Sequence, residues 1–266
     1  MIEILTLLVT GLFVGFMAGL FGIGGGLIIV PVVTYLLIHL HGMNHQLAFA
    51  TGIGSSMISI IFTGSVATFF NYKNKNLNTF YFKKHIGPLM VGSFIGGMLV
   101  IYGNYYYLKV FFVFYCFFAA IKLLTKINFL KPIYYFPEKI IGLIFGLISS
   151  LVGIGGGTLY VPYLVTQKLN IRESVSSASM LGVVIAISTL LCFFMNNLFI
   201  HPITNNFKSI LDYGYIYVPS LIFLTLPSLL SIYFSTKLLI TINEITIKRS
   251  FALLLVIVGC LSFVNL

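Results

Sequence analysis

Long apolar runs separated by short polar stretches make up most of the chain. A helix needs about 20 predominantly apolar residues to cross the ~30 Å hydrocarbon core of a bilayer. The pattern predicts ten helical segments, five in each half, and therefore an all-α, polytopic integral membrane protein. The apolar runs cover residues 4–21, 27–40, 46–70, 86–102 and 108–124 in the first half, and 140–152, 158–167, 174–200, 213–236 and 250–265 in the second.

The composition excludes a soluble enzyme. Of the 266 residues 59% are hydrophobic and only 8% are charged, against roughly 25% charged residues in ordinary soluble domains. A water-exposed surface would lack the charge it needs to stay dispersed. Ten crossings use most of the chain, so no separate soluble domain is expected.

The two halves of the chain repeat each other. Gly11–Pro31 matches Gly142–Pro162 at a constant offset of 131, with eleven of 21 positions identical. We predict one membrane repeat in residues 1–125, a linker in 126–137 and a second repeat in 138–266. An odd number of segments per repeat makes the second half enter the membrane in the opposite direction, which gives an inverted repeat of the kind found in secondary transporters.

The formal net charge of +10 bears first on topology, because basic loops stay on the cytoplasmic side. Alternating sides along ten segments places thirteen basic residues on one side and only Lys109 and Lys208 on the other. The first side is therefore predicted to be cytoplasmic, in the cell membrane, with both termini on the other side. Basic residues scattered between apolar runs do not predict nucleic-acid binding. The thirteen are Lys73, Lys75, Lys83, Lys84, Lys122, Lys126, Lys131, Lys139, Lys168, Arg172, Lys237, Lys248 and Arg249.

Each repeat is interrupted by a glycine run that is predicted to break a helix within the bilayer. Glycine allows positive φ and close approach of a ligand to the backbone. The first N–H groups of the next helix are unpaired and carry the positive end of its dipole, so they attract anions. Whether these broken pairs are re-entrant or cross fully is left open. The predicted anion-binding glycines are Gly22, Gly24, Gly25 and Gly26 in the first run and Gly153, Gly155, Gly156 and Gly157 in the second.

Other glycines are spaced for helix packing instead. Gly11, Gly15 and Gly19 form a GxxxGxxxG series, and Gly142 and Gly146 form a GxxxG pair. Small residues at this spacing let two membrane helices approach closely. We therefore expect these five glycines to lie at helix–helix contacts.

Hydroxyl side chains near the breaks are candidates to bind an oxyanion. Thr51 and Ser179 follow equivalent alanines in the two halves, Ser55 lies one turn after Thr51, and Thr158 follows the second glycine run. The alternative is that each hydroxyl bonds its own helix backbone. No Asp, Glu, Lys or Arg lies near the middle of a predicted segment, so a carboxylate-driven pump is disfavoured.

The five histidines do not form a recognisable metal site. His39, His41 and His45 cluster in a predicted non-cytoplasmic loop, but their spacing has no clear ligand geometry and favours solvated side chains. His85 and His201 lie near predicted segment ends. We therefore expect neither a metal nor a cofactor.

The duplicated GxGGG with a proline five residues on resembles the sulfite exporter TauE/SafE family over nearly the whole chain. The motif maps onto Gly22 to Gly26 with Pro31, and again onto Gly153 to Gly157 with Pro162. The resemblance implies a membrane transporter for small anions, typically sulfite, sulfonates or related organosulfur compounds.

The sequence therefore predicts an anion transporter that works by alternating access, with the two breaks facing each other near the midplane and the halves rocking about the anion. An anion channel and a non-transporting membrane scaffold remain as alternatives. An intramembrane hydrolase is less favoured, because no GxSG nucleophile motif is present. The chain is not expected to be an enzyme, and its oligomeric state is left open.

Overall fold

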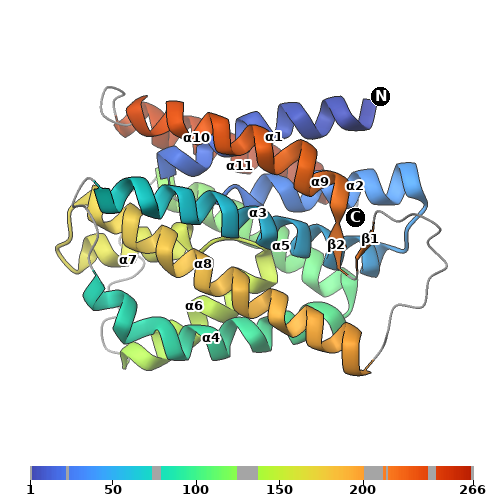
Figure 1. Ribbon diagram of the computed structural model, residues 1–266, viewed down its shortest axis with the longest axis horizontal. Helices are drawn as coiled ribbons and strands as arrows, with labels where there is room; N and C mark the ends of the chain where they lie inside the picture. Colours follow the sequence, from blue (N-terminus) through green and yellow to red (C-terminus); the bar gives the residue numbers. More distant parts are fainter. Residues whose placement is uncertain are drawn as a thin grey trace.

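The fold is described from a computed structural model in which nearly every described segment is helical (Figure 1). The structure describes residues 2–21, 24–73, 79–124, 137–200, 212–213, 215–238 and 244–264. The first half contains α1 (Ile2–Phe21), α2 (Gly26–His41), α3 (His45–Lys73), α4 (Thr79–Tyr102) and α5 (Tyr105–Leu124).

The second half begins with α6 (Glu138–Val152), α7 (Gly157–Thr166) and α8 (Ile171–Met195). A π-helical turn continues α8, and a two-residue antiparallel ribbon then leads into one continuous helical run and a last helix. These later elements are η2 (Asn196–Ile200), β1 (Asp212–Tyr213), β2 (Ile216–Tyr217), α9 (Val218–Ser220), η3 (Leu221–Thr225), α10 (Leu226–Leu238) and α11 (Glu244–Val264).

The predicted segments correspond to these helices, with three larger differences in extent. Helix α11 begins at Glu244 rather than at residue 250. Helix α4 begins at Thr79 rather than at residue 86, so His85 lies on its second turn instead of at a segment end. The run predicted from residue 213 becomes helical only at Val218, because 212–217 includes the β1–β2 ribbon. The predicted linker 126–137 lies outside the described residues except for Pro137, as does His201.

Three helix pairs are stacked in layers across the molecule (Figure 1). Helix α1 packs on α10 at one side, α4 packs on α6 at the other, and α3 packs on α8 between them. The first helix of each half thus packs on the fourth of the other half, as a two-fold relation between the halves would require. The inverted repeat remains a prediction, which this pattern fits.

Glycines form the contacts of both outer layers, as their spacing predicts. A Cβ atom on Gly15 would lie 2.0 Å from the Ser228 carbonyl oxygen of α10. A Cβ atom on Gly146 would lie 2.4 Å from the Leu89 carbonyl oxygen of α4. Only a residue without a side chain allows such backbone contact, so the packing role of the GxxxG glycines is confirmed.

Five helices are long and apolar enough to cross a bilayer, judged over the described residues. Many of their large apolar side chains point outward, including Phe114, which is 67% exposed on α5, and Leu230, which is 68% exposed on α10. Apolar surface of this extent needs lipid around it. The protein is thus an all-α, multi-pass membrane protein.

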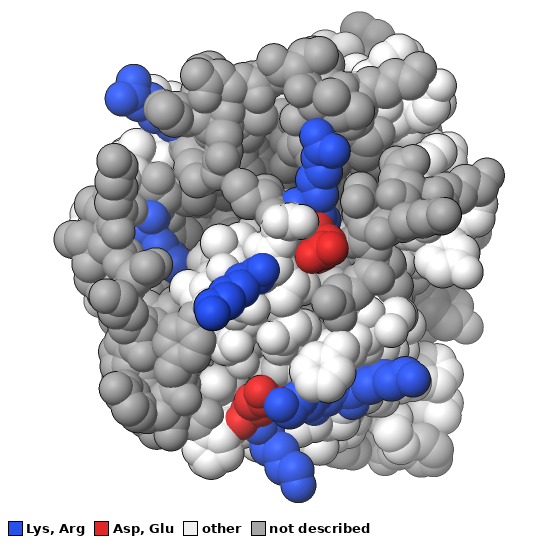
Figure 2. Space-filling view, turned by 90° about the vertical axis from the view of Figure 1, so that its left-hand side faces the viewer, with Lys and Arg blue, Asp and Glu red and all other residues white. Residues whose placement is uncertain are grey.

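Basic side chains gather at one end of the helix bundle, which we call the basic end. Helices α4, α6 and α8 begin here with exposed Lys83, Lys84, Lys139 and Arg172. Figure 2 shows this end, with Lys and Arg side chains spread over it and a few acidic groups among them. We call the other end, where α1 and α3 begin and α2 ends, the opposite end.

Candidate anion-binding site between the two glycine breaks

The second glycine break separates α6 from α7 by a turn with two left-handed glycines. Gly153 ends α6 with φ of 77°, and the Ile154 N–H donates to the Ser149 carbonyl at 2.9 Å. Gly156, the N-cap residue directly before α7, has φ of 75°. Residues other than glycine rarely adopt such φ values, so these positions need glycine. Helices of 15 and 10 residues are each shorter than the ~20 residues of a full crossing.

The first break repeats this geometry where it is described. Gly24 and Gly25 have φ values of 70° and 71°, and Gly25 is the N-cap residue that directly precedes α2. Gly22, also a predicted site residue, lies outside the described residues. Both α2 and α7 therefore begin directly at a glycine, which leaves their first N–H groups without partners in the helix.

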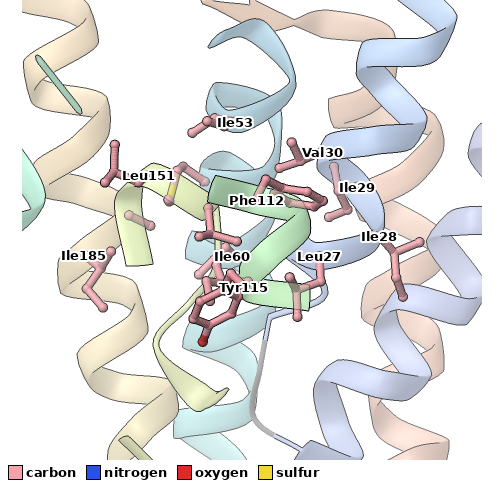
Figure 3. Close-up of a cluster of buried hydrophobic side chains, with 14 of the residues drawn as sticks. Leu27, Ile28, Ile29, Val30, Ile53, Ile60, Phe112, Tyr115, Leu151 and Ile185 are labelled. Atoms are coloured by element: carbon pink, nitrogen blue, oxygen red, sulfur yellow. The ribbon is translucent and has the colours of Figure 1, made fainter. Parts of the chain in front are cut away.

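The two breaks touch each other in the core. A Cβ atom on Gly26 would lie 1.9 Å from the Gly153 carbonyl oxygen, so backbone meets backbone here. The Ser56 hydroxyl of α3 donates to the same carbonyl at 2.7 Å. Figure 3 shows the buried apolar side chains around this contact, among them Val30 and Ile53.

A small hollow lies beside this contact. It is bordered by glycines of both breaks and by hydroxyl residues of α3 and α8, and none of its lining residues is charged. Apart from its open mouth, its cavity volume is only about 10 Å³. That is room for about one water molecule. The lining residues are Ala18, Gly24, Ile60, Thr63, Gly64, Ala67, Gly155 and Ser179.

A row of hydroxyl residues follows one side of α3. Thr51, Ser55, Ser59 and Thr63 are spaced by four, so they lie one turn above another. All four are buried, and the hydroxyls of Thr51 and Ser59 have no hydrogen-bond partner among the described residues. Buried hydroxyls without a partner are costly, which makes them candidate ligands for a polar substrate.

The predicted hydroxyl residues differ in their surroundings. Ser179 lines the hollow while its hydroxyl donates to the Val175 carbonyl at 2.9 Å within α8. The Ser55 hydroxyl accepts a hydrogen bond from the Tyr217 N–H at 3.0 Å. Thr158 shares a hydrogen bond with the Tyr115 hydroxyl of α5, which lies in the buried cluster of Figure 3. Thr51 does not line the hollow.

Ser56 and Thr63 are contact residues outside the predicted set of site residues, although Ser56 is one of the hydroxyls on the third segment that the sequence offers as oxyanion ligands. Ser56 was indistinguishable from its neighbour Ser55, because only the rotation of the helix decides which of them faces the breaks. Thr63 lies outside the duplicated motif and lines the hollow. The regular spacing of four from Thr51 was the one signal that pointed to it.

The opposite end is closed over α3 by the β2 region. The Tyr215 carbonyl oxygen lies 1.9 Å from the position of a Cβ atom on Gly54, so the chain rests directly on α3. The Tyr215 ring packs on Phe193 of α8, with ring centroids 4.9 Å apart. The β2 region therefore covers α3 around Gly54 and Ser55.

Tyr217 connects this cover to the ends of α1 and α2. Its hydroxyl donates to the Glu3 carboxylate and lies 3.1 Å from the His41 Nε2 atom. The His41 Nε2 and Glu3 Oε1 atoms are 3.2 Å apart. His41 is exposed, as expected, but it is the last residue of α2 rather than a loop residue, and it takes part in this three-residue cluster.

The comparisons with known proteins agree in their description. The chain is 29% identical over 267 residues to a probable membrane transporter protein of Haemophilus influenzae, covering 98% of each chain. It is 28% identical over 245 residues to a probable membrane transporter protein of Methanocaldococcus jannaschii, covering 90% of this chain and 85% of the relative. No solved structure matches the chain.

These relatives are named as transporters rather than as enzymes, which fits a transport role. The family model described as Sulfite exporter TauE/SafE matches residues 7–261, nearly the whole chain. The protein is therefore a membrane transporter that belongs to the sulfite exporter TauE/SafE family.

Proposed function

We propose that the protein carries small anions, such as sulfite, a sulfonate or another organosulfur anion, across the cell membrane by alternating access. The contact between the two glycine breaks carries this proposal. Two helices, α2 and α7, begin two residues after glycines that border the same hollow. Their unpaired N–H groups offer an anion hydrogen bonds and a positive dipole end.

Hydroxyl groups complete the proposed site. Thr63 and Ser179 border the hollow, and the hydroxyls of Thr51 and Ser59, which have no partner within the described part of the chain, continue the polar row along α3. Since none of the described residues that border the hollow is charged, amide dipoles and hydroxyls would hold the anion, and selectivity would depend on the geometry of hydrogen bonding rather than on an ion pair.

The hollow supports a carrier rather than an open pore. With room for about one water molecule, it is too narrow for an anion that carries three oxygens, so the helices around it must separate before binding. We place the basic end in the cytoplasm by the positive-inside rule. The cover formed by Tyr215 and Tyr217 then closes the non-cytoplasmic side.

Flux measurements on the purified protein in liposomes test this proposal. The panel is sulfite, sulfate, thiosulfate, taurine and sulfoacetate, each as a labelled solute. We expect at least one anion to show saturable uptake that protein-free liposomes lack. Flux that rises linearly with concentration would indicate a channel instead, and no flux of any anion in the panel would favour a scaffold.

A further inference from the structure

A histidine is enclosed in the core beside the second glycine break. His85 is fully buried, and neither ring nitrogen has a hydrogen-bond partner among the described residues. Gly142 of α6 leaves space for the ring, since a Cβ atom there would lie 3.3 Å from the His85 Nδ1 atom. Buried polar groups are nearly always paired, so this imidazole calls for a functional explanation.

Aromatic rings form the walls around His85. Tyr160 and Tyr163 of α7 meet the imidazole edge to face, with centroids 5.6 and 5.7 Å away. Phe145 of α6 packs on both tyrosines. The Tyr160 hydroxyl also has no hydrogen-bond partner among the described residues. We call His85, Phe145, Tyr160 and Tyr163 the aromatic cage.

The aromatic cage is attached directly to the glycine break. Tyr160 lies in the first turn of α7, where its N–H donates to the Gly156 carbonyl at 2.7 Å. Its ring lies 3.3 Å from the position of a Cβ atom on Gly156. A single side chain therefore separates the imidazole from the break, and any movement of the start of α7 alters the surroundings of His85.

Charged groups near His85 lie at the basic end and not in the cage. Lys84, which directly precedes His85 on α4, is exposed and forms an ion pair with Glu138 of α6. Helix α7 contributes the two tyrosines as its titratable groups here. The other charged residues on the helices around the cage are Lys83 on α4, Lys139 on α6, and Arg172 and Glu173 on the first turn of α8.

These surroundings make the charge of His85 depend on conformation. An imidazolium buried without a hydrogen-bond partner is unfavourable, so the closed cage holds the neutral ring. Imidazole is the side chain that ordinarily changes charge near neutral pH. If the start of α7 moves and water reaches the ring, a proton from that water can add to the lone pair of one ring nitrogen.

We propose that His85 is the proton-binding site that couples anion transport to a pH gradient. This inference rests on the proposed function. The proton binds to His85 from one side of the membrane while the anion occupies the breaks, and it leaves to water on the other side as the cage closes again. No bond within the anion changes, and the proton offsets one negative charge of the bound anion; none of the described residues that line the hollow is cationic.

The test uses full-length protein in liposomes, with thiosulfate and sulfoacetate as solutes because both stay ionised over the pH range. An enclosed pH-sensitive dye reports proton movement alongside labelled anion. For wild type we expect proton movement that requires the anion, and anion accumulation that a pH gradient of one unit raises by up to about tenfold for one proton. His85→Gln should keep downhill anion flux but lose both effects, and the control His45→Gln, at an exposed position, should keep them.

Several outcomes would overturn the inference. Anion flux by wild type without proton movement refutes it whatever the variants do, as does a full pH response in His85→Gln. Tyr160→Phe keeps the aromatic ring and should keep the coupling, but the pH dependence of anion transport should change. An unchanged pH dependence would count against a role of the aromatic cage in proton binding. Absence of flux of every anion in the panel would instead refute the proposed function, and the inference would fall with it.

Discussion

Replacement of Gly26 by alanine isolates the contact between the two breaks. Gly26 does not have positive φ, and alanine favours a helix by about 1 kcal/mol over glycine. The backbone alone would therefore tolerate the change. The new methyl group, however, would lie 1.9 Å from the Gly153 carbonyl oxygen and 2.7 Å from the Ser56 hydroxyl.

The size of the effect follows from these distances. Real Cβ contacts essentially never fall below 3.0 Å, so the two breaks must separate by more than 1 Å. Overpacking of this kind costs about 1–3 kcal/mol, partly offset by the gain in helix propensity. We expect a net loss of stability of about 1 kcal/mol and, since the proposed anion site is displaced, a fall of about tenfold or more in transport rate.

Gly42→Ala is the matched control. Gly42 has φ of 62°, and nothing lies within 4 Å of its Cβ position, so alanine there meets only the left-handed backbone penalty of about 1–2 kcal/mol. Both variants are compared by initial anion flux in liposomes and by thermal unfolding in detergent. The reasoning is refuted if Gly26→Ala transports at the wild-type rate, or if Gly42→Ala loses as much transport as Gly26→Ala.

Three further substitutions test other contacts. Ser56→Ala removes the hydrogen bond to the Gly153 carbonyl and should lower the free energy of unfolding by about 1 kcal/mol; an unchanged denaturation curve would show that the bond contributes nothing. Tyr217→Phe removes the hydroxyl that binds Glu3, so a membrane-impermeant thiol reagent should label Ser55→Cys faster in a cysteine-free background, and equal labelling rates would contradict the cover. Gly15→Leu places a side chain against the Ser228 carbonyl and should prevent folding, as judged by size-exclusion profiles, whereas Gly87→Ala, with open space around its Cβ position, should elute as wild type.

The sequence predicted the parts of the fold that depend on long patterns. Apolar runs and the duplicated glycine motif located the helices and both breaks, because lipid requires about 20 apolar residues per crossing. The predicted start of α4 was wrong because the first two turns of the helix contain Lys83 and Lys84. Their low hydropathy is typical of a loop, so the apolar run seemed to begin only after them. The prediction of a helical segment from residue 213 was wrong at its start, where the β1–β2 ribbon lies. The tyrosines and Ile216 of this ribbon are as apolar as residues of a membrane helix, so hydropathy does not distinguish the two.

The details of the site depend on helix rotation and on contacts between distant segments, which one sequence does not reveal. Ser55 and Ser56 are adjacent, yet one binds the Tyr217 N–H and the other binds the Gly153 carbonyl. The cage around His85 joins α4, α6 and α7. No spacing along the chain indicates that these residues meet.

The exchange of partners in the outer layers means that neither half of the chain is an independent body. Helix α1 packs on α10 with direct backbone contact, and α6 packs on α4 in the same way. If the two halves rocked apart as separate blocks, both of these contacts would have to open at once. The alternating movement that we propose would therefore have to shift α1 together with α10, and α4 together with α6. Each moving unit would then combine helices from both halves of the chain, so the two halves could not act as separate rigid bodies.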